Sequence, residues 1–181
     1  MSGSSSPSVF FTTNLNEVLT DIRSMKVDES SAVIFEIDNI LLDIKGRIIK
    51  PLHEIFNLCV QKKLKIFIIT SRVGTKDNIN LTLTQLKING ITSYESIYFL
   101  KPTRDDVSTM KFKARKNLFD RGFKVVYTFG NDDSDGINCM YNGTFVKVTA
   151  ITTKYFGDIK DDDIKDESEP SSTMKGSFLL I

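Results

Sequence analysis

The sequence predicts an α/β fold: a doubly wound, Rossmann-like domain with a mostly parallel sheet of about five strands and no large cap domain. Short, uninterrupted apolar runs recur along the chain, and such runs are typical of strands buried on both faces. Between them lie segments of about 10 to 14 residues with the apolar spacing of helices. Several apolar runs end in polar residues, at the carboxyl ends where open α/β sheets bind ligands.

The composition is typical of one globular domain. The chain has 181 residues, of which 40% are hydrophobic and 26% are charged, and its net charge is +1. This length supports one substantial core. A nearly neutral chain is not expected to bind nucleic acid directly or to bind a membrane surface. Cys59 and Cys139 are most simply two reduced, buried thiols, as expected in a cytosol-like compartment.

No signal peptide or membrane-spanning segment is evident. The start of the chain is Ser-rich and lacks both a basic region and a long apolar region. No apolar run approaches the ~20 residues that a membrane-spanning helix needs. We therefore expect a cytoplasmic or other intracellular location, with a place inside a larger particle as an additional hypothesis.

The first helix and strand lead to two acidic residues. Asn14 or Asn16 is expected to cap a short helix that runs through residue 22. An apolar strand follows at about 32–37, and Glu36 and Asp38 lie at its carboxyl end. Alternation along a strand points both acids to the same side. Two converging carboxylates are costly unless a cation, a proton or a phosphoryl group is present.

The next segment predicts a turn, a helix and a second strand. A tight turn or small flap is expected around Gly46. Pro51 opens a helix whose apolar residues follow the i, i+3, i+4, i+7 spacing. The apolar strand at 65–70 then ends in the polar residues Thr70, Ser71 and Arg72.

The second half of the chain repeats the alternation of helix and strand. Helices are expected at about 77–87 and 108–121, the first of them stopped by Asn89-Gly90. The remaining expected strands lie at 96–100, 124–129 and 144–149. A loop rich in acidic residues, 130–136, follows the strand at 124–129. Three polar loops therefore fall at strand carboxyl ends, where they are expected to share one crevice.

The chain divides into three parts. Residues 1–12 are expected to be a flexible Ser-rich terminus, and residues 13–157 to form the α/β domain. Residues 158–181 form an acidic tail with an apolar end. Two alternatives are open for that end: it docks on the domain or on a partner.

In order and spacing, four motifs resemble those of the haloacid dehalogenase (HAD)-like superfamily, most closely its acid-phosphatase branch. Motif one is a strand with two acids, motif two a strand ending in Thr or Ser, motif three a helical Lys, and motif four a loop with Asp residues. The matching positions are Glu36 and Asp38, Thr70 and Ser71, Lys113 with Lys111 as the competitor, and Asn131, Asp132 and Asp135.

The resemblance implies phosphoryl transfer to a carboxylate. The first acid is the nucleophile, the second the general acid/base, and Mg²⁺ offsets the charge. Applied to this chain, the catalytic positions are Glu36, Asp38, Thr70 and Lys113. The phosphate-binding positions are Thr70, Ser71 and Lys113. The metal positions are Glu36, Asp38, Asn131, Asp132 and Asp135.

Three positions depart from the family pattern. The nucleophile position is Glu36, and one extra methylene moves the attacking oxygen by roughly 1 Å, which can cost ~10²-fold in rate. Ile40 replaces a Thr of motif one. Asn131 replaces the first Asp of motif four, unless a one-residue slip lets Asp132 or Asp133 take its place.

Two functions remain open from the sequence. The first is a catalytically degenerate acid-phosphatase-like domain, with no cofactor, that acts as a binding or structural protein in an assembly. An open crevice without a cap suits a large protein partner. The alternative is a Mg²⁺-dependent phosphomonoesterase with a Glu nucleophile. The basic run at 101–124 is most simply a solvated helix face, with an acidic partner surface, a phosphate-bearing ligand or the chain's own tail as alternatives.

Overall fold

The structure is a computed structural model that describes residues 11–102, 106–136, 141, 143–149 and 177–180. Within these residues the chain forms one all-parallel sheet of seven strands in the order β1-β6-β5-β2-β3-β4-β7. The strands are β1 (Phe11–Thr12), β2 (Ser31–Phe35), β3 (Lys65–Val73), β4 (Ser96–Leu100), β5 (Lys124–Gly130), β6 (Thr144–Lys147) and β7 (Ser177–Leu180).

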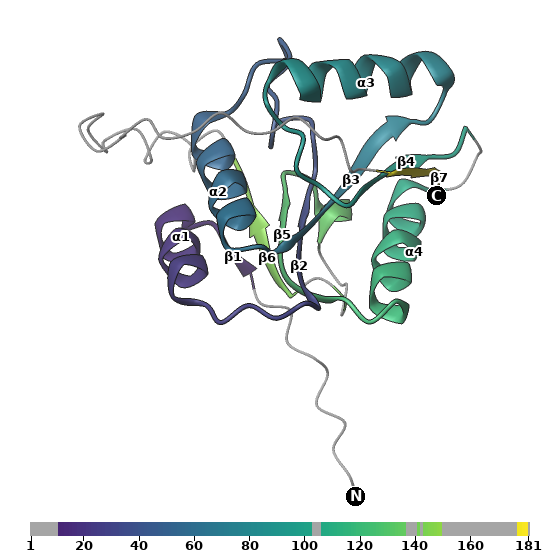
Figure 1. Cartoon of the computed structure of the whole chain (residues 1–181). Helices are drawn as coiled ribbons and strands as arrows, with labels where there is room; N and C mark the ends of the chain where they lie inside the picture. The colour runs from purple at the N-terminus through teal and green to yellow at the C-terminus, as the bar shows by residue number, and fades with distance from the viewer. Residues whose placement is uncertain (1–10, 103–105, 137–140, 142, 150–176, 181) are drawn as a thin grey trace, which may run out of the picture.

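Four helices cover the two faces of this sheet. They are α1 (Leu15–Ser24), α2 (Lys50–Gln61), α3 (Lys76–Ile88) and α4 (Val107–Asp120). Buried side chains of α1, α2 and α3 share one core cluster, and those of α4 share a second cluster with the other face of the sheet. Figure 1 shows α1 and α2 on one side of the strands and α4 on the other. The predicted doubly wound α/β fold is therefore confirmed, and the described residues contain no separate cap.

The core explains why β2 is buried on both faces. Its side chains alternate between the two clusters, with Ala32 and Ile34 on the α4 side and Val33 and Phe35 on the other side. The ring of Phe35 stacks on Phe129 of β5 with the centroids 4.5 Å apart. A strand at the centre of such a sheet is buried on both faces, and after Ser31 every residue of β2 is apolar.

Both edges of the sheet hold short strands beyond the five that were predicted. β1 pairs with β6, within the part of the chain that was expected to be a flexible terminus. β7 pairs with β4, so of the two alternatives, docking on the domain or on a partner, the structure shows residues 177–180 docked on the domain. The acidic segment before β7 lies outside the described residues, as do residues 1–10.

The predicted turn around Gly46 is present. The Asp43 carboxylate accepts hydrogen bonds from the backbone N–H groups of Lys45 and Arg47, and it also pairs with the Arg47 guanidinium. Gly46 has φ +73°, a conformation that glycine adopts at little cost.

Each of the described helices is too short or too polar to cross a membrane.

Of the two cysteines that were predicted to be buried thiols, the structure describes one. Cys59 is a free, buried cysteine of α2, and burial raises the pKa of its thiol to about 12. It is therefore an unreactive core residue. Cys139 lies outside the described residues.

Candidate functional site

The carboxyl ends of β5, β2 and β3 lie side by side, because these strands are neighbours in the sheet. Three predicted site residues meet there: Glu36 directly after β2, Thr70 in β3, and Asp135 in a short 3₁₀ helix (η1, Asp133–Asp135) after β5. Helix α4 reaches the same point from one face of the sheet and contributes Lys111. The polar residues expected at these strand ends therefore do come together, and they form a buried group.

Glu36 is the centre of the cluster, and its side chain is only 3% exposed. Its Oε1 accepts hydrogen bonds from the Thr70 hydroxyl at 2.7 Å and from the backbone N–H of Ser71 at 3.2 Å. Its Oε2 accepts from Lys111 Nζ at 2.8 Å. All three donors around the carboxylate are thus directed at Glu36 itself.

Lys111 lies between two carboxylates. Its side chain is 1% exposed, and Nζ pairs with both Glu36 and Asp135. The other oxygen of Asp135 accepts the backbone N–H groups of Asn131 at 3.2 Å and Asp132 at 3.1 Å. We call Glu36, Thr70, Lys111 and Asp135 the buried cluster.

Burial shifts the proton equilibria of this cluster. Loss of water raises the pKa of Glu36, and the like charge of Asp135 adds to that effect, although Lys111 opposes it. Burial alone would lower the pKa of Lys111, but the charges of Glu36 and Asp135 outweigh burial and raise it. Lys111 therefore stays an ammonium, while Glu36 gains a tendency to hold a proton.

Asp38 is the second acid of motif one, and it is held by Arg72. The guanidinium donates to both carboxylate oxygens, from Nε at 2.9 Å and from Nη2 at 2.6 Å. The remaining Nη1 donates to Thr82 and Gln85 of α3. The side chain of Asp38 is 48% exposed, so this pair is reached by solvent, unlike the buried cluster.

Arg72 is a site residue to which sequence reasoning gave no role. The available signal was its place directly after Thr70 and Ser71 at a strand end. Arg115 was also missed, as one residue of the basic run. It is buried and donates to the backbone carbonyls of Ser134 and Asp135, which fixes η1 against α4.

The structure corrects the choice of lysine. Lys113 was the preferred motif-three residue, but its side chain is exposed on α4 and lines a hollow beside Leu179 and Leu180. Lys111 occupies the predicted position instead. The reason is helical phase: the buried face of α4 includes Met110, Lys111, Ala114, Arg115 and Leu118, and a residue two positions after Lys111 points away from it.

The side chains of the other two motif-four acids have partners outside the cluster. Asp132 is exposed and caps η1 by accepting the backbone N–H of Ser134, which with nearby lysines lowers its pKa. Asp133 is exposed and pairs with Lys147 at 2.6 Å. Asn131 is half-buried and contributes its backbone N–H to Asp135. Neither of the two acids takes the place left by Asn131.

Ile40 stands at the position of the motif-one Thr and has no hydroxyl group. Its side chain is fully buried in the apolar cluster that α1, α2 and α3 share. The position is therefore part of the hydrocarbon core rather than of the crevice.

The donor set does not fit Mg²⁺ as it stands. Mg²⁺ needs free oxygen ligands in near-ideal octahedral geometry. Glu36 and Asp135 already share the Lys111 ammonium, and Asp38 is paired with Arg72. Within the described residues, no three His, Cys, Asp or Glu side chains converge in a way that suits a metal ion.

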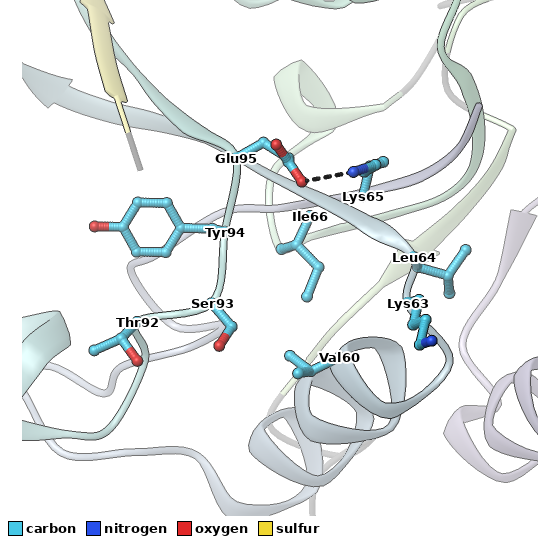
Figure 2. Close-up of a pocket in the computed structure, with 9 residues that line it drawn as sticks. All are labelled: Val60, Lys63, Leu64, Lys65, Ile66, Thr92, Ser93, Tyr94 and Glu95. Atoms are coloured by element: carbon cyan, nitrogen blue, oxygen red, sulfur yellow. Dashed lines mark hydrogen bonds and ion pairs between the residues drawn. The ribbon is translucent and has the colours of Figure 1, made fainter. Parts of the chain in front are cut away.

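A separate hollow lies at the opposite end of the sheet, where β3 begins (Figure 2). It measures about 270 Å³, and Val60, Leu64 and Ile66 form its apolar wall. Lys65 pairs with Glu95 across its rim at 3.2 Å. Its residues match none of the four motifs.

Comparison with known families identifies a related family. The family model for the HAD superfamily, subfamily IIIB (acid phosphatase), matches residues 45–146. This range contains Thr70, Lys111 and Asp135 but begins after Glu36 and Asp38. No curated protein matches the chain. The match covers more than half of the 181 residues, so the chain belongs to subfamily IIIB, the acid phosphatases, of the HAD superfamily.

Proposed function

We propose that this chain is a catalytically silent member of its family that acts as a binding domain in a protein assembly. One observation carries the proposal: the Glu36 carboxylate occupies the hydrogen-bond donors that a phosphoryl group would need. Those donors are the Thr70 hydroxyl, the Ser71 backbone N–H and the Lys111 ammonium.

The extra methylene of Glu36 gives the reason. In the family chemistry the nucleophilic carboxylate attacks phosphorus while the Thr and Lys hold the phosphoryl oxygens. A side chain longer by roughly 1 Å extends into the space where those oxygens would lie. A bound anion would have to displace Glu36 from three hydrogen bonds and add negative charge beside Asp135.

The charges of the crevice support the same conclusion. Each of the three carboxylates is paired with a side-chain cation, Lys111 or Arg72, so little negative charge remains to attract Mg²⁺. The raised pKa of Glu36 disfavours the ionised form, which is the only nucleophilic form of a carboxyl group. Nucleophile, metal and phosphate site are all weakened by contacts within the chain.

Binding by this domain is supported by its exposed surface. The described residues form no cap over the crevice. Large apolar side chains are exposed on α4 and β7, among them Phe112, Phe119 and Phe178. The rings of Phe112 and Phe119 both lie against Tyr141, so these side chains form one exposed aromatic group, which supports a protein interface on α4. We propose a protein partner, and we retain an intracellular location and the absence of a cofactor as parts of this hypothesis.

A phosphatase assay separates this proposal from the enzyme alternative. With Mg²⁺ and p-nitrophenyl phosphate, we expect the wild-type protein to show no turnover above that of the buffer. Turnover that Asp38→Asn abolishes would instead establish a phosphomonoesterase with a Glu nucleophile.

A double variant tests whether Glu36 is the block. Glu36→Asp with Asn131→Asp shortens the acid and restores the motif-four carboxylate, so the three donors become free. We expect this variant to bind inorganic phosphate or vanadate in the presence of Mg²⁺ more tightly than wild type, measured by calorimetry. Asn131→Asp alone is the matched control, because it leaves Glu36 on the donors. If the control gains as much affinity as the double variant, Glu36 is not the block.

A further inference from the structure

The last strand, β7, differs from its neighbour β4 in the burial of its side chains. All four of its residues are exposed, with Phe178, Leu179 and Leu180 at 53%, 39% and 44%. The strand that it covers, β4, is buried at each of its five positions. An apolar segment therefore seals the edge of β4 while leaving much of its own side-chain surface in water.

The contact between β7 and the edge of β4 is closest at the end of β7. Leu180 packs against Gly74, and a Cβ at Gly74 would overlap the Leu180 Cδ2 methyl group. The Gly74 N–H donates to the carbonyl of Leu100 at 2.7 Å, which fixes this notch to the end of β4. We call the side of β4 that pairs with β7, together with Gly74, the acceptor edge. It recognises an extended strand with a leucine at the position of Leu180.

The seam between β4 and β7 is nevertheless imperfect. Ser96 and Ser177 are register partners, and the buried Ser96 hydroxyl has no hydrogen-bond partner among the described residues. Leu179 and Leu180 also border a hollow of about 260 Å³ that Lys113 and Tyr98 line. An unsatisfied buried hydroxyl and a hollow beside the strand both weaken its hold.

The chain before β7 is long enough for the strand to dock on another molecule. Residues 150–176 separate the described part of the chain after β6 from β7, a length of 27 residues. In the sheet, β6 and β7 are five strand spacings apart, on the order of 24 Å. A chain of this length spans at most roughly 90 Å. Residues 177–180 can therefore reach either their own acceptor edge or that of a neighbouring copy.

We propose that the acceptor edge is an interaction site for residues 177–180 of a second copy of this chain, so that two copies associate by strand exchange. The exchanged strand takes the parallel register seen within one chain, from Ser96 opposite Ser177 to Phe99 opposite Leu180. Residues 177–180 are the expected ligand of this edge because the same segment pairs with β4 within one chain. The proposal does not depend on whether the crevice is catalytically silent.

Disulfide trapping tests the exchange directly in the full chain. One protein carries Ser96→Cys and the other Ser177→Cys, both with Cys139→Ser, while the native Cys59 stays buried and unreactive. Adjacent strands bring such thiols within bonding range. After mixing and oxidation with oxidised glutathione, we expect a disulfide-linked heterodimer.

Two controls make this experiment decisive. Ala32→Cys in one chain and Val125→Cys in the other form a matched pair on the neighbouring strands β2 and β5, where we expect no intermolecular bond. A single chain carrying both Ser96→Cys and Ser177→Cys should close an internal disulfide, which shows that the geometry permits the bond. If that chain closes but the mixed chains link no more than the control pair, β7 stays on its own chain and the proposal is wrong.

Oligomeric state supplies a second test. We expect light scattering with size-exclusion chromatography to show dimers of the wild-type protein that increase with concentration. Leu180→Asp should reduce the dimer fraction at least tenfold, because a charge cannot occupy the Gly74 notch. Leu81→Asp, at an exposed leucine of α3, should leave the fraction unchanged. A wild-type protein that stays monomeric, or dimers that persist with Leu180→Asp, would overturn the proposal.

Discussion

Glu36 and Asp38 are two acids of one motif, two residues apart at the end of β2, yet their surroundings differ sharply. Glu36 is buried and shares Lys111 with Asp135. Asp38 is half-exposed and pairs with Arg72 where solvent reaches it. Removing one partner of a buried ion pair leaves an uncompensated charge in the interior, whereas an exposed pair contributes little to stability.

A charged residue can be needed for catalysis or for stability, and the two acids help to separate these reasons. In a working phosphatase both acids would be required by the chemistry. The buried cluster also joins the end of β2 to β3, α4 and η1 through hydrogen bonds, so its members contribute to the fold independently of any chemistry. The pair of Asp38 with Arg72 joins β3 and α3 to the turn after β2, but it does so where water can replace either partner. Stability measurements on the two groups should therefore diverge.

The largest effect is expected from Lys111→Met. The substitution leaves Glu36 and Asp135 buried side by side without their cation, and we expect the free energy of unfolding to fall by about 3–5 kcal/mol. Urea denaturation followed by circular dichroism measures this change. Lys113→Met on the exposed face of α4 is the matched control and should stay within about 0.5 kcal/mol of wild type. Equal losses from the two variants would contradict the assignment of Lys111 to the cluster.

A pH effect of intermediate size is expected from Glu36. Its pKa in the folded protein is raised above the ordinary value of 4.5, so its contribution to stability is complete below that value and is lost as the pH rises through the folded pKa. Glu36→Gln removes this dependence. We therefore expect the stability of wild type relative to Glu36→Gln to fall as the pH increases above about 4.5, measured by urea unfolding across that range.

Asp43 provides the opposite sign as a control. Hydrogen bonds from Arg47 lower its pKa below 3.8, so its contribution is present above that pH and is lost as the pH falls through the folded pKa. Asp43→Asn should accordingly show a difference from wild type that shrinks on acidification. If Glu36→Gln and Asp43→Asn change in the same direction with pH, the cause given for the Glu36 shift is wrong.

The smallest effect is expected from Asp38→Asn. This variant removes a half-exposed carboxylate from Arg72, which keeps Thr82 and Gln85 as partners. We expect a loss of about 0–1 kcal/mol, which diminishes further at ~1 M salt because solvent-exposed charges are screened. Thermal unfolding at low and high salt measures it. A loss as large as that of Lys111→Met would remove the distinction between the two groups.

The α/β fold and the five inner strands could be predicted from the sequence because the sequence patterns that indicate them are local. Apolar runs and helix spacing placed the five strands and four helices, and the polar residues at three strand ends predicted the crevice. The lysine was harder, because Lys111 and Lys113 stand in one basic run and only the phase of α4 decides between them. Arg72 needed knowledge of where α3 lies, since its partners come from two separate segments. β7 could not be predicted as a strand of this sheet, because its pairing with β4 joins residues far apart in the chain.

Gly130 at the end of β5 belongs to motif four, and packing alone gives a reason for a glycine at this position. A Cβ there would overlap the side chain of Asp135, which folds back over the glycine to reach Lys111. Every larger residue would push the acid off its cation, whether or not a substrate ever arrives. A survey of tolerated substitutions scored only by folded yield should therefore show intolerance at this glycine, even though the assay involves no substrate.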